Sequence, residues 1–103
     1  MGPSRRGDPL AVTSFADKRT KALFESGDCP VKWRSFKAVA ARKLDMIDAA
    51  TALADLRSPP GNRLEALQGD RKGQHSIRIN DQWRVCFVWT AEGPADVEIV
   101  DYH

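Results

Sequence analysis

Two arginines near the middle of the chain combine a residue type and a spacing that could do chemistry. Arg78 and Arg84 flank a polar stretch, Asn80–Gln82, that separates two runs of alternating large apolar residues. A three-residue loop here pairs Ile79 with Trp83 and gathers the apolar side chains of both strands on one face. The same register places Arg78 opposite Arg84 on the other face, where like charges destabilise a sheet. A phosphate held between the two guanidinium groups removes that cost.

This phosphate-binding interpretation has alternatives. Both long side chains can extend into water, and a two-residue loop would move Arg84 to the apolar face. The overall net charge of +2 decides nothing, but residues 57–84 carry six basic and three acidic side chains, whereas residues 85–103 carry four acidic ones and no Lys or Arg. A basic middle fits a polyanionic partner, although a solvated surface is the commoner explanation of charge alone.

Other side chains with chemical potential are better explained as structure. Cys29 and Cys86 lack metal or redox spacing, which favours two reduced packing thiols in a cytoplasmic protein. His75 shares the parity of the apolar residues that follow it, so we expect a half-buried strand residue rather than a catalyst. Aromatic rings can stack on bases, but periodicity assigns three indoles to the core: Trp33, Trp83 and Trp89.

Helices are predicted in the first half of the chain. Asp17 can cap a helix from Lys18 to about Glu25, which Gly27 ends, and Leu10–Phe15 could form a short strand before it. A longer helix is predicted over Val31–Ala49, because large apolar residues recur at steps of three and four. The residues of this stripe are Trp33, Phe36, Ala40, Leu44 and Ile47. A short helical piece through Leu53 and Leu56 and a loop over 58–62 follow.

After Asn62 the apolar period changes to two, which predicts an antiparallel meander. The expected strands are Arg63–Leu67, Gln74–Ile79, Trp83–Trp89 and Val97–Tyr102, with turns at 69–73, 80–82 and 92–94. Helices followed by a meander indicate an α+β fold with helices on one face of the sheet. The other face is then open for function.

The length of 103 residues and the 42% hydrophobic content favour one domain. We expect that domain to span residues 13–103 and residues 1–12 to be a disordered extension or a remnant of cloning. No apolar run is long enough to span a membrane, and no apolar region follows the N-terminal arginines as in a secretory signal.

Several motifs together closely resemble the HigB toxins, the plasmid maintenance system killer family within the RelE/ParE superfamily. They are S-F-A-D-K-R-T-K-A-L-F at 14–24, L-Q-G-D-R-K-G at 67–73, S-I-R-I-N-D-Q-W-R at 76–84 and D-Y-H at 101–103. The resemblance covers Thr13–His103 without an evident gap. It implies a RelE-like fold, with two to three N-terminal helices packed on one face of a small curved antiparallel sheet.

The resemblance also implies a function. Such a toxin is a ribonuclease that enters the ribosomal A site, cleaves mRNA there and stops growth, without a cofactor. Its expected partners are the ribosome, mRNA and a HigA-like helix-turn-helix antitoxin, and the complex with the antitoxin binds operator DNA. Two alternatives stay open: a ParE-like toxin that inhibits DNA gyrase, and a degenerate toxin that binds only its antitoxin and DNA.

Residue roles follow by the same resemblance. Glu65 matches the general base of YoeB-like toxins, and Arg84 matches the arginine that holds the scissile phosphate. His103 matches a C-terminal general acid, accompanied by Asp101 and Tyr102. Further RNA or phosphate contacts are expected from Arg63, Arg71, Lys72 and Arg78. Gln68 stands where relatives often have a lysine, which removes one expected contact.

A base, a cluster of cations and an acid are sufficient to cut RNA without a metal, through attack of the 2′-hydroxyl on its own phosphate. The products would be a 2′,3′-cyclic phosphate and a 5′-hydroxyl end. The orientation of His103 stays open, because it shares the parity of Val97 and Ile99, which look buried. Either a turn or bulge brings it to the face of Arg84, or Val100 points inward instead of Ile99.

Overall fold

A computed structural model describes residues 11–101 of the chain. Its helical segments are α1 (Lys18–Ser26), η1 (Val31–Phe36), α2 (Lys37–Ala49), η2 (Leu53–Arg57), η3 (Pro60–Asn62) and η4 (Gly69–Arg71), where η denotes a 3-10 helix. Its strands are β1 (Glu65–Ala66), β2 (His75–Arg78), β3 (Trp83–Thr90) and β4 (Gly93–Asp101).

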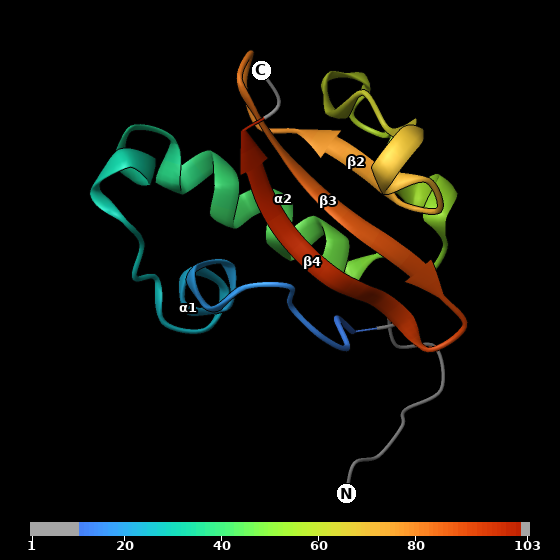
Figure 1. The fold of residues 1–103 in the computed structure, drawn as a ribbon, viewed down its shortest axis with the longest axis horizontal. Helices are drawn as coiled ribbons and strands as arrows, with labels where there is room; N and C mark the ends of the chain where they lie inside the picture. The colour runs from blue at the N-terminus through green and yellow to red at the C-terminus, as the bar shows by residue number, and fades with distance from the viewer. Residues whose placement is uncertain (1–10, 102–103) are drawn as a thin grey trace, which may run out of the picture.

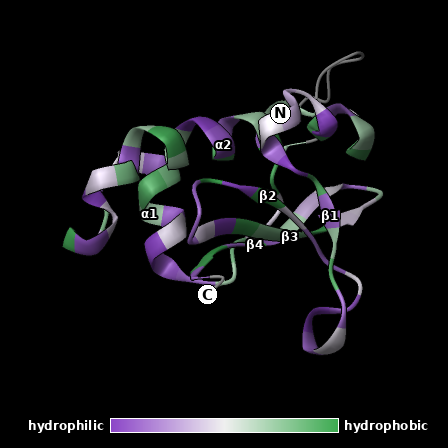
Figure 2. Cartoon of the chain, turned by 90° about the horizontal axis from the view of Figure 1, so that it is seen from above, coloured by the Kyte–Doolittle hydropathy of each residue, from purple (hydrophilic) through white to green (hydrophobic). Residues whose placement is uncertain are grey.

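The helices and strands form two layers. The strands make one antiparallel sheet in the order β1-β2-β3-β4, so each strand pairs with its neighbour in sequence. Helices α1 and α2 lie on the same side of the sheet (Figures 1 and 2). The predicted α+β meander with helices on one face is therefore confirmed, and neither α1 nor α2 covers the opposite face, which is called the open face below.

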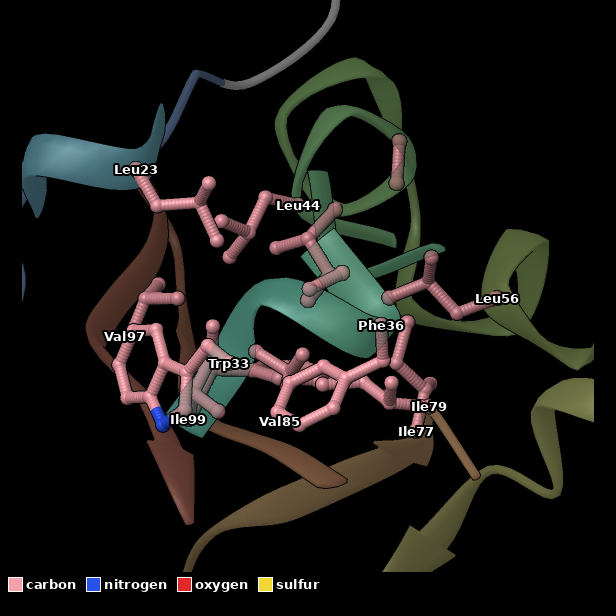
Figure 3. Packing of buried hydrophobic residues seen from close by; sticks show 14 residues of the cluster. Leu23, Trp33, Phe36, Leu44, Leu56, Ile77, Ile79, Val85, Val97 and Ile99 are labelled. Atoms are coloured by element: carbon pink, nitrogen blue, oxygen red, sulfur yellow. The ribbon is translucent and has the colours of Figure 1, made fainter. Parts of the chain in front are cut away.

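The core lies between α2 and the sheet. All five residues of the predicted apolar stripe are at most 6% exposed: Trp33, Phe36, Ala40, Leu44 and Ile47. They pack against Ile79, which follows β2, and against five residues of three strands: Ile77, Val85, Phe87, Val97 and Ile99 (Figure 3). Burial of a large apolar side chain stabilises the fold by about 1.5–3 kcal/mol, so this contact is what fixes the sheet against the helix.

The predicted helix over Val31–Ala49 is one helical run with a change of geometry. The segment up to Phe36 is a 3-10 helix, and the α-helix begins at Lys37. Phe36, with φ −120° and ψ 15°, breaks the α geometry at the junction. Periodicity could not reveal this, because both forms place the same side chains on the sheet.

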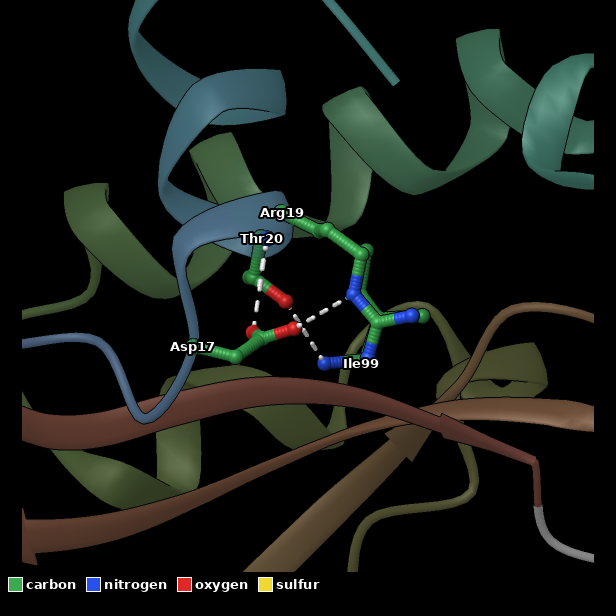
Figure 4. Close-up of polar contacts among 4 residues, drawn as sticks. All are labelled: Asp17, Arg19, Thr20 and Ile99. Atoms are coloured by element: carbon green, nitrogen blue, oxygen red, sulfur yellow. Dashed lines mark hydrogen bonds and ion pairs between the residues drawn. The ribbon is translucent and has the colours of Figure 1, made fainter. Parts of the chain in front are cut away.

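Helix α1 is attached to the edge of β4 by polar contacts. The carboxylate of Asp17 accepts a hydrogen bond from the Thr20 amide at 3.3 Å and thus caps the helix as predicted. Thr20 is fully buried, and its hydroxyl oxygen accepts a hydrogen bond of 3.1 Å from the backbone amide of Ile99 in β4 (Figure 4). Gly27 ends the helix with a φ of 79°, a conformation that glycine adopts without strain.

The strand predicted at Leu10–Phe15 does not form within residues 11–15, and Leu10 lies outside the described residues. Only Phe15 makes a bridge, parallel to Val97, although the Thr13 amide also donates to Pro94. The helix cap at Asp17 follows at once and ends the extended segment. These contacts nevertheless cover part of the outer edge of β4, which a sheet would otherwise leave unpaired.

Each of the described strands differs in length from its prediction: β2 lacks Gln74 and Ile79 at its ends, β3 extends by one residue to Thr90, and β1 and β4 differ most. β1 has two residues instead of five, because Arg63 adopts a left-handed conformation with φ 47° just before it. β4 begins at Gly93, four residues earlier than predicted, so Gly93 and Pro94 belong to the strand rather than to the turn. A bulge at Asp96, with φ 52°, accommodates the extra residue of β4 opposite β3.

Candidate active site

The open face of the sheet carries a diagonal of polar residues. Arg78 pairs with Arg84 as predicted, and Ser76 pairs with Glu65 on one side and Cys86 on the other. Because side chains alternate between the faces, all five residues point away from the helices. Arg84, Ser76 and Glu65 therefore lie along one line that crosses β3, β2 and β1.

Arg84 is held by residues along this diagonal. It is only 8% exposed, and its Nε donates a hydrogen bond to Ser76 Oγ at 2.8 Å. One terminal nitrogen donates to the carbonyl oxygen of Arg63 at 2.6 Å and lies 3.5 Å from a carboxylate oxygen of Glu65. The candidate phosphate-binding arginine and the candidate base are thus in direct contact.

The two opposed arginines diverge instead of extending together into water. Arg84 leans towards Ser76 and Glu65, whereas Arg78 makes an ion pair with Asp81 in the following turn. Asn80 shapes that turn, since its side-chain oxygen accepts the amides of Gln82 and Trp83 at 2.9 and 2.8 Å. The carboxylates of Asp81 and Glu65 thus offset the repulsion between Arg78 and Arg84. From the sequence, that role was expected of a bound phosphate.

A hollow of about 310 Å³ opens between these side chains. It is lined by Arg63, Glu65, Arg78, Asn80, Asp81 and Arg84. Three arginines thus line the hollow together with a carboxylate, that of Glu65, which contacts one of them. Such a site can bind a phosphodiester through paired donors and offers an oxygen base beside it.

The structure places Arg71 and Lys72 outside this hollow. Arg71 bonds to Gln74 at 3.0 Å and to the carboxylate of Glu98 at 3.3 Å. Lys72 is exposed in the turn that follows η4. Arg63, Glu65, Arg78 and Arg84 are therefore the predicted site residues that the structure brings together.

The end of β4 reaches the border of this face. Ile99 is buried on the helix side, and Val100 lies opposite Arg84, so the alternative in which Val100 points inward is wrong. Asp101 pairs with Trp83, is exposed and accepts a hydrogen bond from Gln82 at 2.9 Å. Tyr102 and His103 lie outside the described residues, and their assigned roles stay predictions.

The residues interpreted as structural have structural surroundings. His75 is half-buried and stacks on Phe87 with ring centroids 6.4 Å apart. Burial raises the pKa of the Cys86 thiol, so this cysteine is a weak nucleophile. Trp33 is 1% exposed and meets Trp83 edge-on at 6.2 Å. None of these residues lines the hollow.

Sequence reasoning missed two residues close to the arginines. Ser76 contacts Arg84 and could have been found, since the predicted register makes the two diagonal neighbours on one face. Lys43 comes from α2 and hydrogen-bonds to Asn62 at 2.6 Å. Partial burial lowers the pKa of Lys43, as do, to a smaller extent, the charges of Arg42 and Arg78. No local pattern relates this lysine to the site.

Two features are absent from residues 11–101. No three His, Cys, Asp or Glu side chains in that range gather in a way that could hold a metal ion. No helix within it is long and apolar enough to span a membrane.

These observations define a class of protein: a two-layer α+β domain with an arginine–carboxylate cluster on its open sheet face. A family described as the RelE-like toxin of type II toxin–antitoxin system HigB matches residues 13–103. Because this match covers most of the chain, the protein belongs to that family, as the sequence motifs indicated.

Two toxins of known sequence agree with this assignment. Toxin HigB-1 of Vibrio cholerae serotype O1 is 52% identical over 62 residues, 60% of this chain and 64% of that toxin, slightly less than two thirds of its length. Endoribonuclease HigB of Proteus vulgaris is 32% identical over 89% of this chain and 99% of its own. A solved YoeB/ParE toxin from Agrobacterium tumefaciens, 17% identical, aligns with a TM-score of 0.49 over 90% of this chain and 98% of that one.

Proposed function

We propose that this toxin is a ribosome-dependent endoribonuclease that cleaves mRNA in the A site and thereby stops translation and growth. The observation that carries the proposal is the contact between Arg84 and Glu65 beside a hollow lined by two further arginines. A phosphate bound there would lie next to an oxygen base. The name of the Proteus vulgaris relative, an endoribonuclease, supports the same activity.

In the proposed reaction Glu65 removes the proton of the 2′-hydroxyl, which attacks the adjacent phosphorus. Arg84, with Arg63 and Arg78, stabilises the charge that grows on the phosphate oxygens. The bond from phosphorus to the 5′-oxygen then breaks, and His103 protonates the leaving oxygen. A histidine suits this role because it exchanges protons near neutral pH. Asp101 and Tyr102 would assist the acid, and Arg71 and Lys72 would contact RNA outside the hollow.

The proposed reaction needs no metal ion, since cations and proton donors of the protein meet each requirement of the step. A sulfur atom in place of a nonbridging oxygen of the scissile phosphate tests this point. We expect slower cleavage that Mn²⁺ or Cd²⁺ does not restore. Restoration by a thiophilic metal would show that a metal ion contacts that oxygen and would contradict the metal-free mechanism.

The proposed partners are the ribosome, mRNA and a HigA-like helix-turn-helix antitoxin that neutralises the toxin in the cytoplasm and joins it on operator DNA. Expression of the intact chain alone should arrest bacterial growth, and co-expression of the neighbouring antitoxin gene should restore it. An Arg84→Ala variant serves as the control for toxicity. Normal growth during verified production of the intact, folded chain in a sensitive host would contradict the proposal.

A further inference from the structure

We propose that Ser76 is a positioning residue, whose buried hydroxyl fixes the direction of the Arg84 guanidinium and thereby its ability to stabilise a phosphate. This inference rests on the proposed function and concerns the same site. Ser76 itself does not line the hollow, so it acts through Arg84.

The first observation is the hydrogen bond between the two residues. Ser76 is fully buried and Arg84 is 8% exposed, and their Oγ and Nε atoms are 2.8 Å apart. A buried donor without an acceptor costs the desolvation of that donor. Water has little access here, so the serine hydroxyl supplies an acceptor that Nε would not readily find in solvent.

The second observation is that another nitrogen of the same planar group is also fixed. One terminal nitrogen of Arg84 bonds to the carbonyl oxygen of Arg63 at 2.6 Å. Arg63 turns the chain from η3 towards β1 and has a φ of 47°. This value lies in the left-handed region, which residues other than glycine rarely adopt. Two restrained nitrogens define both the position and the plane of a guanidinium group.

The third observation is the like charge directly across the ladder. Arg78 is the register partner of Arg84, and without other contacts the two guanidinium groups would repel each other. The bond to Ser76 draws Arg84 along the diagonal, towards Glu65 and away from Arg78. A side chain much larger than threonine at position 76 would block this path, whereas alanine would leave the path open without an acceptor.

If Ser76 acts through its hydroxyl, a variant that lacks the hydroxyl and one that keeps it should differ in activity. In Ser76→Ala the guanidinium loses its restraint at Nε, and we expect kcat to fall by about 10- to 100-fold, the size of effect that a small misplacement in a catalytic site can have. KM should change much less. Ser76→Thr retains a hydroxyl in a strand, where β-branched residues fit, and should recover most of the rate.

The matched control is Thr20→Val, because Thr20 is the other fully buried hydroxyl residue whose oxygen accepts a hydrogen bond among residues 11–101. Its bond to the Ile99 amide lies on the helix side of the sheet, away from the hollow. Both variants remove one buried hydrogen bond. A role in stability alone predicts that both lower the unfolding midpoint and that neither changes kcat of the folded protein.

The experiment combines kinetics with a readout of the bond itself. Single-turnover cleavage of mRNA on ribosomes is measured for wild type, Ser76→Ala, Ser76→Thr, Thr20→Val, Arg84→Ala and the Ser76→Ala/Arg84→Ala double variant. Solvent exchange of the Arg84 Nε proton is measured by NMR on the free toxins. Among the variants that keep Arg84, we expect only Ser76→Ala to exchange its Nε proton faster than wild type. We also expect the double variant to cleave no more slowly than Arg84→Ala.

Three results would overturn the inference. One is unchanged Nε exchange in Ser76→Ala, another is a rate loss from Ser76→Ala that is equally large when Arg84 is absent, and the third is a Ser76→Ala rate that matches wild type while Arg84→Ala is inactive. If wild type cleaves no RNA, the proposed function fails, and the exchange measurement alone decides whether Ser76 fixes Arg84. If wild type cleaves, Arg84→Ala does not, and Ser76→Ala matches wild type, only the positioning role is refuted.

Discussion

Replacing Arg84 by lysine should separate the charge of this residue from its geometry. Arg84 presents two nitrogens to two fixed acceptors, Ser76 at 2.8 Å and the Arg63 carbonyl at 2.6 Å, while it is 8% exposed. An ammonium group keeps the positive charge but cannot form a planar fork. Arg84→Lys should therefore lose most of the catalytic benefit although its net charge is unchanged.

The expected sizes follow from these contacts. Loss of two hydrogen bonds, one buried and one partly buried, at about 0.5–1.5 kcal/mol each predicts a destabilisation of about 1–3 kcal/mol. Loss of a preorganised donor that faces growing charge predicts a fall in rate of about 100- to 1000-fold. The decrease in rate should thus exceed anything that the change in stability explains.

The assay is single-turnover cleavage of a defined mRNA on ribosomes, with a urea unfolding curve for each protein. Arg57→Lys is the matched control, because Arg57 is exposed and outside the hollow. The control should cleave at the wild-type rate. Folded Arg84→Lys that cleaves within about threefold of wild type would refute the reasoning, since that difference is under 1 kcal/mol.

Four further perturbations have expected outcomes. Glu65→Gln should slow single-turnover cleavage by about 100- to 10,000-fold if Glu65 is the base, and deletion of His103 should do the same without changing the melting curve; wild-type rates would contradict these roles. Leu44→Ala should cost about 2–5 kcal/mol in urea unfolding, because Leu44 is fully buried; a loss below about 1 kcal/mol would contradict the packing. Hydrogen bonds from the amide and hydroxyl of Thr51, then the Ala52 amide, lower the pKa of Asp55. The resulting stabilisation of the folded state is fully present at pH values above the ordinary pKa of an aspartate. It is lost as the pH falls through the lowered pKa of Asp55. Unfolding midpoints of Asp55→Asn should therefore fall less than those of wild type on acidification, and equal slopes would contradict this.

The fold could be predicted where a pattern has one physical solution. The alternation around Asn80–Gln82 allows one register that buries the apolar side chains, and it correctly paired Ile77 with Val85 and Arg78 with Arg84. Errors occurred where conformations compete locally. The left-handed conformation of Arg63 precedes a β1 that is shorter than predicted, and the bulge at Asp96 lies in a β4 that begins earlier than predicted. Neither feature was predictable, because the residue types alone do not require it.

The candidate site was predictable in composition but not in contacts. Register alone brought Arg78 and Arg84 to the open face, while Glu65 came from the family resemblance. Alternation could not reveal that Arg84 bends across Ser76 to Glu65, since this depends on where a long side chain finds acceptors. For the same reason, alternation could not reveal that Arg71, a predicted RNA contact, pairs with Glu98 outside the hollow.

The most direct test of the central claim is cleavage of a defined mRNA by the purified wild-type protein, with free mRNA, ribosome-bound mRNA and DNA gyrase supplied in separate reactions. We predict cuts within the codon in the A site of programmed ribosomes, ends that carry a 2′,3′-cyclic phosphate and a 5′-hydroxyl, and no effect on supercoiling by gyrase. Inhibition of gyrase with intact mRNA would contradict the nuclease account, as would equally efficient cutting of free mRNA.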